Sequence, residues 1–226
     1  MAPTSMVDLP FAPLAILTFL GTCTAVAACF AAITFCALTG RARKARIWLF
    51  VLGGGLGVYA GLLLGASLFS KEYVLSAGVE KYFCEVDCHL AYSVQNVQRT
   101  KSYAGQTAKG NLYVVTLRTR FDEKTISPRR PKDAPLMPNP RRVVVLDADG
   151  NSYVPVIEPN DPGTRPLSTA LIPGESYVTR FVFDLPAKVR EPRLFLDNDP
   201  WPNHFLIGHE DSPFHKKKYF LLSVTG

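Results

Sequence analysis

Two long stretches of this 226-residue sequence contain no charged residue and no histidine: residues 11–39 and residues 47–69. Each is long enough to cross a bilayer, because about 20 apolar residues span the hydrocarbon core. The absence of Asp, Glu, Lys, Arg and His also argues against a proton path or an ion site inside either stretch. We therefore expect two membrane helices that do not transport ions by themselves.

The sequence also lacks the short motifs that mark common enzymes. It has no Gly-x-Ser-x-Gly and no His-Glu-x-x-His, and its glycine-rich run, residues 53–57, lies in an apolar stretch. Residues 147–151 lack the further acid of a calcium loop and predict a hairpin turn instead. His204, His209 and His215 match no metal motif and predict a solvated loop. We expect no enzyme activity, no cofactor and no resident metal.

The N-terminal stretch is predicted to be an uncleaved helix, because the residues before it contain Asp8 and no Lys or Arg. A signal peptide has a basic start and a shorter apolar region. The loop between the stretches, residues 40–46, carries Arg41, Arg43, Lys44 and Arg46. Positively charged short loops stay in the cytoplasm. We therefore expect the N-terminus and the C-terminal part outside, in the periplasm or the extracellular space.

The net charge of the chain is +6, and the loop cations account for much of it. Those cations suit contact with the anionic head groups of a lipid bilayer. The remaining excess of positive charge on the outer part is mild. It gives no reason to expect a nucleic-acid partner.

Four glycines spaced four residues apart form a glycine zipper in the second stretch: Gly53, Gly57, Gly61 and Gly65. Glycines at this spacing share one helix face and let another backbone come close. The first stretch offers a second strip of small residues, namely Gly21, Ala25, Ala28 and Ala32. Either the two strips close the hairpin against each other, or one strip receives a helix from another subunit.

The rest of the chain predicts an all-β sandwich of the immunoglobulin-like type, with a barrel as the alternative. Short runs of β-branched and aromatic residues alternate with polar positions and are separated by turn residues. We expect residues 1–70 to form a two-helix transmembrane hairpin and residues 71–226 to form the β domain. The candidate strands are residues 82–97, 111–121, 142–146, 153–157, 177–185, 193–196 and 218–224.

Two proline-rich loops, residues 127–142 and residues 197–213, are the candidate contacts with a partner protein. Proline stiffens a loop, so its side chains are presented at low entropic cost. Arginine and tryptophan are common anchors of protein interfaces. The residues that we expect to contact a partner are Arg129, Arg130, Arg141, Arg142 and Trp201.

Cys84 and Cys88 leave three alternatives open. In a straight strand they lie about 13 Å apart, which is too far for a disulfide, and both are then buried free thiols. If a turn or bulge lies between them, they can form a disulfide in an oxidising compartment. A metal site with His89 is the third alternative, and thiolate ligands would suit copper.

Two resemblances to known families follow from these residues. Two outward-ending helices before a β domain with Cys84-x3-Cys88 resemble subunit II of cytochrome c oxidase, which implies a dinuclear copper site. In this chain Tyr92 stands where that family has its histidine, and Met137 is the only methionine of the outer part. Separately, the stretches 83–92 and 121–128 resemble bacterial immunoglobulin-like extracytoplasmic modules, which implies a sandwich and an outward location.

We therefore expect a non-catalytic accessory subunit that packs into, and stabilises, a larger membrane complex. A respiratory or photosynthetic energy-converting complex is the expected host, and the partners are other membrane subunits and the bilayer. One alternative is a copper or redox protein that uses Cys84 and Cys88. The other is a ligand-binding or adhesion module.

Overall fold

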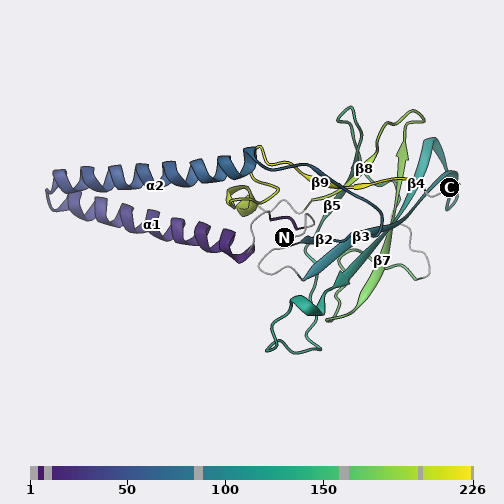
Figure 1. The fold of residues 1–226 in the computed structure, drawn as a ribbon, viewed down its shortest axis with the longest axis horizontal. Coiled ribbons are helices and arrows are strands. Elements are labelled where there is room, and N and C mark those ends of the chain that lie inside the picture. The colour runs from purple at the N-terminus through teal and green to yellow at the C-terminus, as the bar shows by residue number, and fades with distance from the viewer. Residues whose placement is uncertain (1–4, 8–11, 84–88, 158–162, 198–200, 225–226) are drawn as a thin grey trace. The chain divides into compact units, whose positions relative to one another are not determined.

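The computed structural model describes residues 5–7, 12–83, 89–157, 163–197 and 201–224. The chain divides into two compact units (Figure 1). A helical unit contains residues 7–71 and 199–216, and a β unit contains residues 2–6, 72–198 and 217–226. Because the units exchange segments, neither is one continuous stretch of chain. The sequence predicts a single domain boundary after residue 70. The two units are defined by contacts and not by independent folding, so that boundary stays a prediction.

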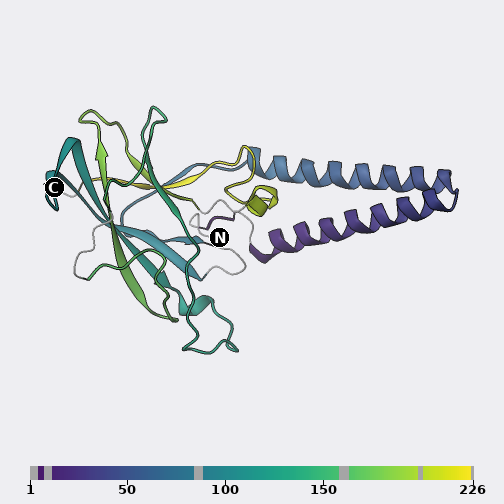
Figure 2. The same ribbon diagram turned by 180° about the vertical axis from the view of Figure 1, so that it is seen from behind.

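The helical unit is built on two long antiparallel helices, α1 (Ala12–Leu38) and α2 (Ala42–Leu68). Residues 13–38 and 42–68 are long and apolar enough to cross a membrane. The turn between the helices contains Gly40 at a φ of 68°, a left-handed conformation that commonly ends a helix. The expected helical hairpin is therefore present, and the two helices lie closest near this turn in both views (Figures 1 and 2).

The facing sides of the helices follow a heptad-like pattern. Buried and half-buried positions of α1 recur at alternating spacings of four and three residues, as in Ala15, Phe19, Thr22, Val26, Cys29, Ile33 and Cys36. In α2, half-buried positions recur every seven residues, as in Ala45, Leu52, Tyr59 and Ala66. This spacing is typical of long helices that pack side by side.

The β unit contains two sheets within the described residues. One sheet has the order β2-β3-β4-β7, and its neighbouring strands are antiparallel. The other has the order β1-β9-β8-β5-β6, in which β1 and β9 are parallel. The strands are β1 (Tyr73–Leu75), β2 (Lys81–Phe83), β3 (Leu90–Tyr103), β4 (Gln106–Phe121), β5 (Arg142–Leu146), β6 (Ser152–Tyr153), β7 (Ser176–Leu185), β8 (Arg193–Asp197) and β9 (Lys218–Leu221).

The core of the β unit lies between these sheets. Val115, Leu117 and Phe183 come from the first sheet, Leu194 and Phe220 come from the second, and all belong to one buried cluster. Over parts of β4 and β7 the inward residues alternate with arginines and other polar residues, as the sequence predicts. On the opposite face, Leu112, Val114 and Val182 form a second, smaller buried cluster. The β-sandwich is confirmed, and the alternative of a single closed barrel is wrong.

Residues 82–97 were expected to form one strand, and this prediction is wrong. The chain reverses between β2 and β3, whose residues pair antiparallel with Phe83 opposite Leu90. Cys84 and Cys88 belong to the connection between the two strands and lie outside the described residues.

Ser5 and Met6, which precede α1 in the sequence, belong to the β unit. Ser5 pairs with Tyr82, and the backbone N–H of Met6 donates to the carbonyl oxygen of Tyr82 at 3.1 Å. The Met6 side chain is 1% exposed and joins the sandwich core. The buried Lys218 Nζ donates to the carbonyl oxygen of Ser5. The chain therefore enters the hairpin from the β unit and returns to the β unit after it.

Candidate functional site

The glycine row of α2 forms an open face, which we call the glycine face: Gly53, Gly57, Gly61 and Gly65. A Cβ atom built on any of the four would have no heavy atom within 4 Å. At about 100° of rotation per residue, this row lies on the side of the helix opposite to Leu52, Tyr59 and Ala66. Gly53, Gly57 and Gly61 are exposed, and Gly65 is half-buried.

The small strip of α1 does not meet the glycine face either. Gly21, Ala25 and Ala28 are exposed, and Ala32 is half-buried. Gly21 and Ala25 line an apolar groove of about 340 Å³ beside Gly55 of α2. The α1 residues that face α2 are those of the heptad-like series, such as Ala15, Phe19 and Cys29. The expectation that the two strips close the hairpin against each other is therefore not met.

Most of the arginines expected to contact a partner are engaged within the chain. The Arg141 guanidinium lies 4.2 Å from the ring centre of Phe83, and that of Arg130 lies 5.3 Å from the ring centre of Phe121. These contacts fix the proline-rich loop to the sandwich.

Of the other three residues expected to contact a partner, one is paired within the chain and two are exposed. Arg142 Nη2 forms an ion pair with Asp197 Oδ2 at 2.7 Å. Arg129 and Trp201 are exposed. The role of all five residues in partner contact stays a prediction.

A pocket of about 370 Å³ lies beside this loop, lined by Glu123, Ile126, Ser127, Pro128, Arg130, Lys132 and Pro173. Its charged lining is mixed in sign, so it does not select strongly for an anion or a cation. The sequence showed no motif for it, because its walls come from segments about 40 residues apart.

A charged network joins β2 to the end of β4. Arg120 binds Glu80 with two hydrogen bonds, from Nε at 2.7 Å and from Nη2 at 2.6 Å. It also forms an ion pair with Asp122 at 3.2 Å. The Tyr82 hydroxyl donates to Asp122 Oδ2 at 2.7 Å. No local sequence pattern indicates this network, because its two halves, around β2 and at the end of β4, are about 40 positions apart.

The network shifts the pKa values of its members. Burial, and then the hydrogen bond to Asp122, raises the pKa of Tyr82 to about 12. Burial alone would favour the protonated form of Asp122, but hydrogen bonds from Arg120, Tyr82 and the Lys124 backbone lower its pKa to about 2. The hydrogen bond from Arg120 also lowers the pKa of Glu80. The carboxyl groups of Glu80 and Asp122 are therefore both ionised at neutral pH. This suits a structural role, in which they hold Arg120 in place.

His89, the described member of the proposed metal set, is bound within the sandwich. Its Nδ1 lies 2.7 Å from Thr125 Oγ1, and its ring stacks on Phe121 with centroids 5.6 Å apart. Within the described residues, no group of three potential metal ligands comes together. Whether Cys84 and Cys88 form a disulfide, remain thiols or bind metal lies outside the described part of the chain.

The histidine-containing segment is not the solvated loop that the sequence predicted. His209, Glu210, Asp211 and His215 are all buried. The backbone of Asp211 binds two of the histidines. Its N–H donates to His209 Nδ1 at 3.1 Å, and its carbonyl oxygen accepts from His204 Nδ1 at 2.8 Å. Two of these histidines therefore pair with backbone groups a few residues away, which composition alone does not reveal.

Comparisons with known proteins give no family for the chain. No family model and no curated protein matches it. Among solved structures, the secreted protein MPT63 of Mycobacterium tuberculosis is 15% identical, with 58% of this chain and 92% of that chain covered at a TM-score of 0.42. The yjhA protein of Bacillus subtilis is 13% identical, with 66% and 100% covered at a TM-score of 0.39. Likenesses this distant carry no argument about function.

Proposed function

We propose that this chain is a non-catalytic, membrane-anchored accessory subunit that packs into a larger membrane complex and stabilises it. The observation that carries the proposal is the uncovered glycine face of α2. It supplies a docking surface for a helix of another subunit. A respiratory or photosynthetic complex is the host class that we propose from the sequence.

The physics of helix association in lipid supports a role between chains. Lipid tails are as apolar as the side chains, so membrane helices associate through close packing rather than through the hydrophobic effect. Glycines allow that packing because two backbones can approach each other directly. At each of the four glycine positions this chain leaves room for a partner backbone, since a Cβ built there has no neighbouring heavy atom within 4 Å.

The topology that we propose places the β unit and the N-terminus on the same side of the membrane. Residues 5 and 6 precede α1 and yet belong to the β unit. A hairpin that crosses the bilayer twice returns the chain to its starting side, which satisfies this arrangement. The basic residues of loop 40–46 then lie in the cytoplasm. The β unit, an immunoglobulin-like sandwich in this proposal, lies outside.

Purification from native membranes in mild detergent tests the docking proposal. We expect the wild-type chain to migrate with a larger complex on a native gel, with partner subunits identified by mass spectrometry. The double variant Gly57→Leu/Gly61→Leu should lose that complex, because two leucine side chains would hold the backbones apart. Val51→Leu, which enlarges a different face of α2, is the matched control and should keep it.

The outcomes separate clearly. Both leucines enter open space within this chain, so the variant should retain wild-type helix content by circular dichroism. A wild-type chain that is a stable monomer without partners would contradict the proposal. So would a double variant that keeps the same partners as the control.

A further inference from the structure

We propose that residues 201–215 form a wedge that enters the outer interface of the bilayer, with Trp201 and Phe214 in direct contact with lipid. This inference rests on the proposed membrane-spanning hairpin. The segment connects β8 to β9 in the sequence and yet belongs to the helical unit. It begins with the short helix η2 (Trp201–Phe205), near the open end of the hairpin (Figure 1).

The wedge contacts both helices at positions well inside their outer ends, which are the ends far from the turn at Gly40. The Tyr59 hydroxyl donates to the carbonyl oxygen of Phe205 at 2.5 Å, and the Phe205 ring stacks on Phe19 with centroids 6.4 Å apart. Tyr59 precedes the end of α2 at Leu68 by about 13 Å of helix. Helices of 27 residues are about 40 Å long, whereas the hydrocarbon core is about 30 Å thick. In a centred hairpin, Phe205 therefore lies inside the hydrocarbon boundary.

Backbone outside helices and barrels is tolerated at this depth only when its polar groups are satisfied within the protein. Part of the wedge backbone is satisfied in this way by four successive turns, in which an N–H donates to the carbonyl three residues earlier. The donors are Leu206, His209, Ser212 and His215, at 3.0–3.1 Å. The Ser212 hydroxyl also donates to the carbonyl oxygen of Leu206 at 2.5 Å.

The outer surface of the wedge has the chemistry of a lipid interface. Trp201 is 70% exposed and Phe214 is 74% exposed, whereas Glu210 and Asp211 are buried. Aromatic side chains are enriched where the hydrocarbon meets the head groups.

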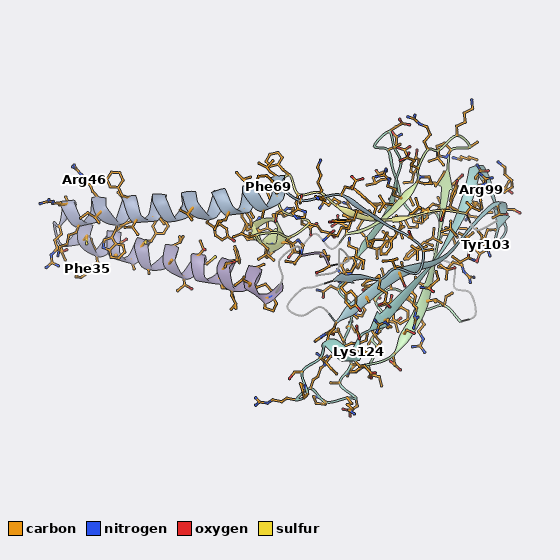
Figure 3. The ribbon with its side chains drawn as sticks, viewed as in Figure 1. Phe35, Arg46, Phe69, Arg99, Tyr103 and Lys124 are labelled. Carbon is orange, nitrogen blue, oxygen red and sulfur yellow. The ribbon has the colours of Figure 1, made fainter. Side chains whose placement is uncertain are left out.

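The neighbouring residues of the helical unit continue this surface. Phe69, directly after α2, is also exposed and projects away from the helix (Figure 3). Lys71 and Lys216 are exposed as well. Their ammonium groups suit anionic lipid heads.

The backbone at Phe214 supplies an independent observation. Its φ is 64°, in the left-handed region that a bulky residue rarely adopts. Glycine or asparagine would adopt this conformation more readily. A bulky apolar residue held out of the protein in a strained conformation points to a role for its side chain, and lipid contact is that role in our proposal.

Tryptophan fluorescence tests the wedge, because the chain has only Trp48 and Trp201. The full chain is reconstituted in vesicles of phosphatidylcholine and phosphatidylglycerol whose acyl chains carry bromine at a shallow or a deep carbon. In Trp48→Phe, we expect the remaining Trp201 to be quenched by bromolipid, more strongly by the shallow label. Water-like emission without lipid quenching would overturn the proposal. Protection from both bromolipid and acrylamide would also overturn it, since it would indicate a protein contact.

Trp201→Phe separates this proposal from the proposed function. Its remaining Trp48 lies within α2, so bromolipid quenching of Trp48 alone would show an inserted hairpin without a wedge. Loss of quenching at both tryptophans would overturn membrane insertion itself.

A second pair of variants lacks both native tryptophans. Phe214→Trp should again be quenched by the shallow label. The matched control Val154→Trp, at an exposed position of the β unit, should not be quenched. Equal quenching of the two would overturn the proposal.

Discussion

Replacing Asp122 with asparagine should remove a pH-dependent part of the stability of the β unit. The folded pKa of Asp122 is about 2, compared with an ordinary value of 3.8. A shift of nearly two units corresponds to about 2 kcal/mol in the free energy of unfolding. Solvent screening reduces this little, because the side chain is only 8% exposed.

The direction of the pH effect follows from the lowered pKa. Above about pH 4, Asp122 is ionised in both the folded and the unfolded chain, and its contribution to stability is complete. As the pH falls from about 4 towards 2, the unfolded chain takes up a proton before the folded chain does, and the contribution is lost. The wild-type β unit should therefore become less stable across this window, and Asp122→Asn should show a smaller change.

The assay is urea unfolding of the full chain in detergent, followed by near-ultraviolet circular dichroism of the tyrosines at pH 6, 4 and 2. At pH 6, Asp122→Asn should lower the free energy of unfolding by about 2 kcal/mol. Asp149→Asn is the matched control, because its ion pair with Arg190 is exposed and exposed ion pairs contribute little to stability. If Asp122→Asn matched the wild type at pH 6 and kept the same pH dependence, the reasoning would be refuted.

Three further substitutions test other parts of the structure. Gly110→Ala should cost about 2 kcal/mol or more, because its Cβ would lie 2.0 Å from the carbonyl oxygen of Leu185; an unchanged urea midpoint would contradict this. Met6→Ala should cost about 2–4 kcal/mol by the same measurement, whereas wild-type stability would show that residues 5–6 are not part of the core. Phe214→Gly should raise the thermal unfolding temperature, since it relieves a left-handed conformation worth about 1 kcal/mol, and a lower temperature would argue against that strain.

The strands of the sandwich were largely predictable, because burial of one face imposes a two-residue period on each. β5 was predicted with its observed bounds, and β4 and β7 were predicted with their buried faces. The same signal failed between β2 and β3, where alternation continues across a reversal of the chain. β1 has only three residues, too few for a period to appear.

The contacts that decide the candidate sites are not local in sequence. The glycine spacing predicts which residues share a face of α2, but not what that face meets. Small residues occur on all sides of α1, so the sequence did not show which of its residues face α2. Ser5 and Met6 pair with Tyr82, and the wedge leaves the β unit for the helices. Such pairings depend on the assembled fold, and no local pattern predicts them.

Site-specific photocrosslinking in native membranes tests the central claim most directly. Phe50 precedes Gly53 by one helical turn on the same face and is 80% exposed. A photoreactive phenylalanine analogue at Phe50 should give one discrete adduct with a different membrane protein. The same analogue at Val51, on another face, should give only lipid adducts. Adducts with lipid alone at both positions, or with a second copy of this chain at Phe50, would contradict the account.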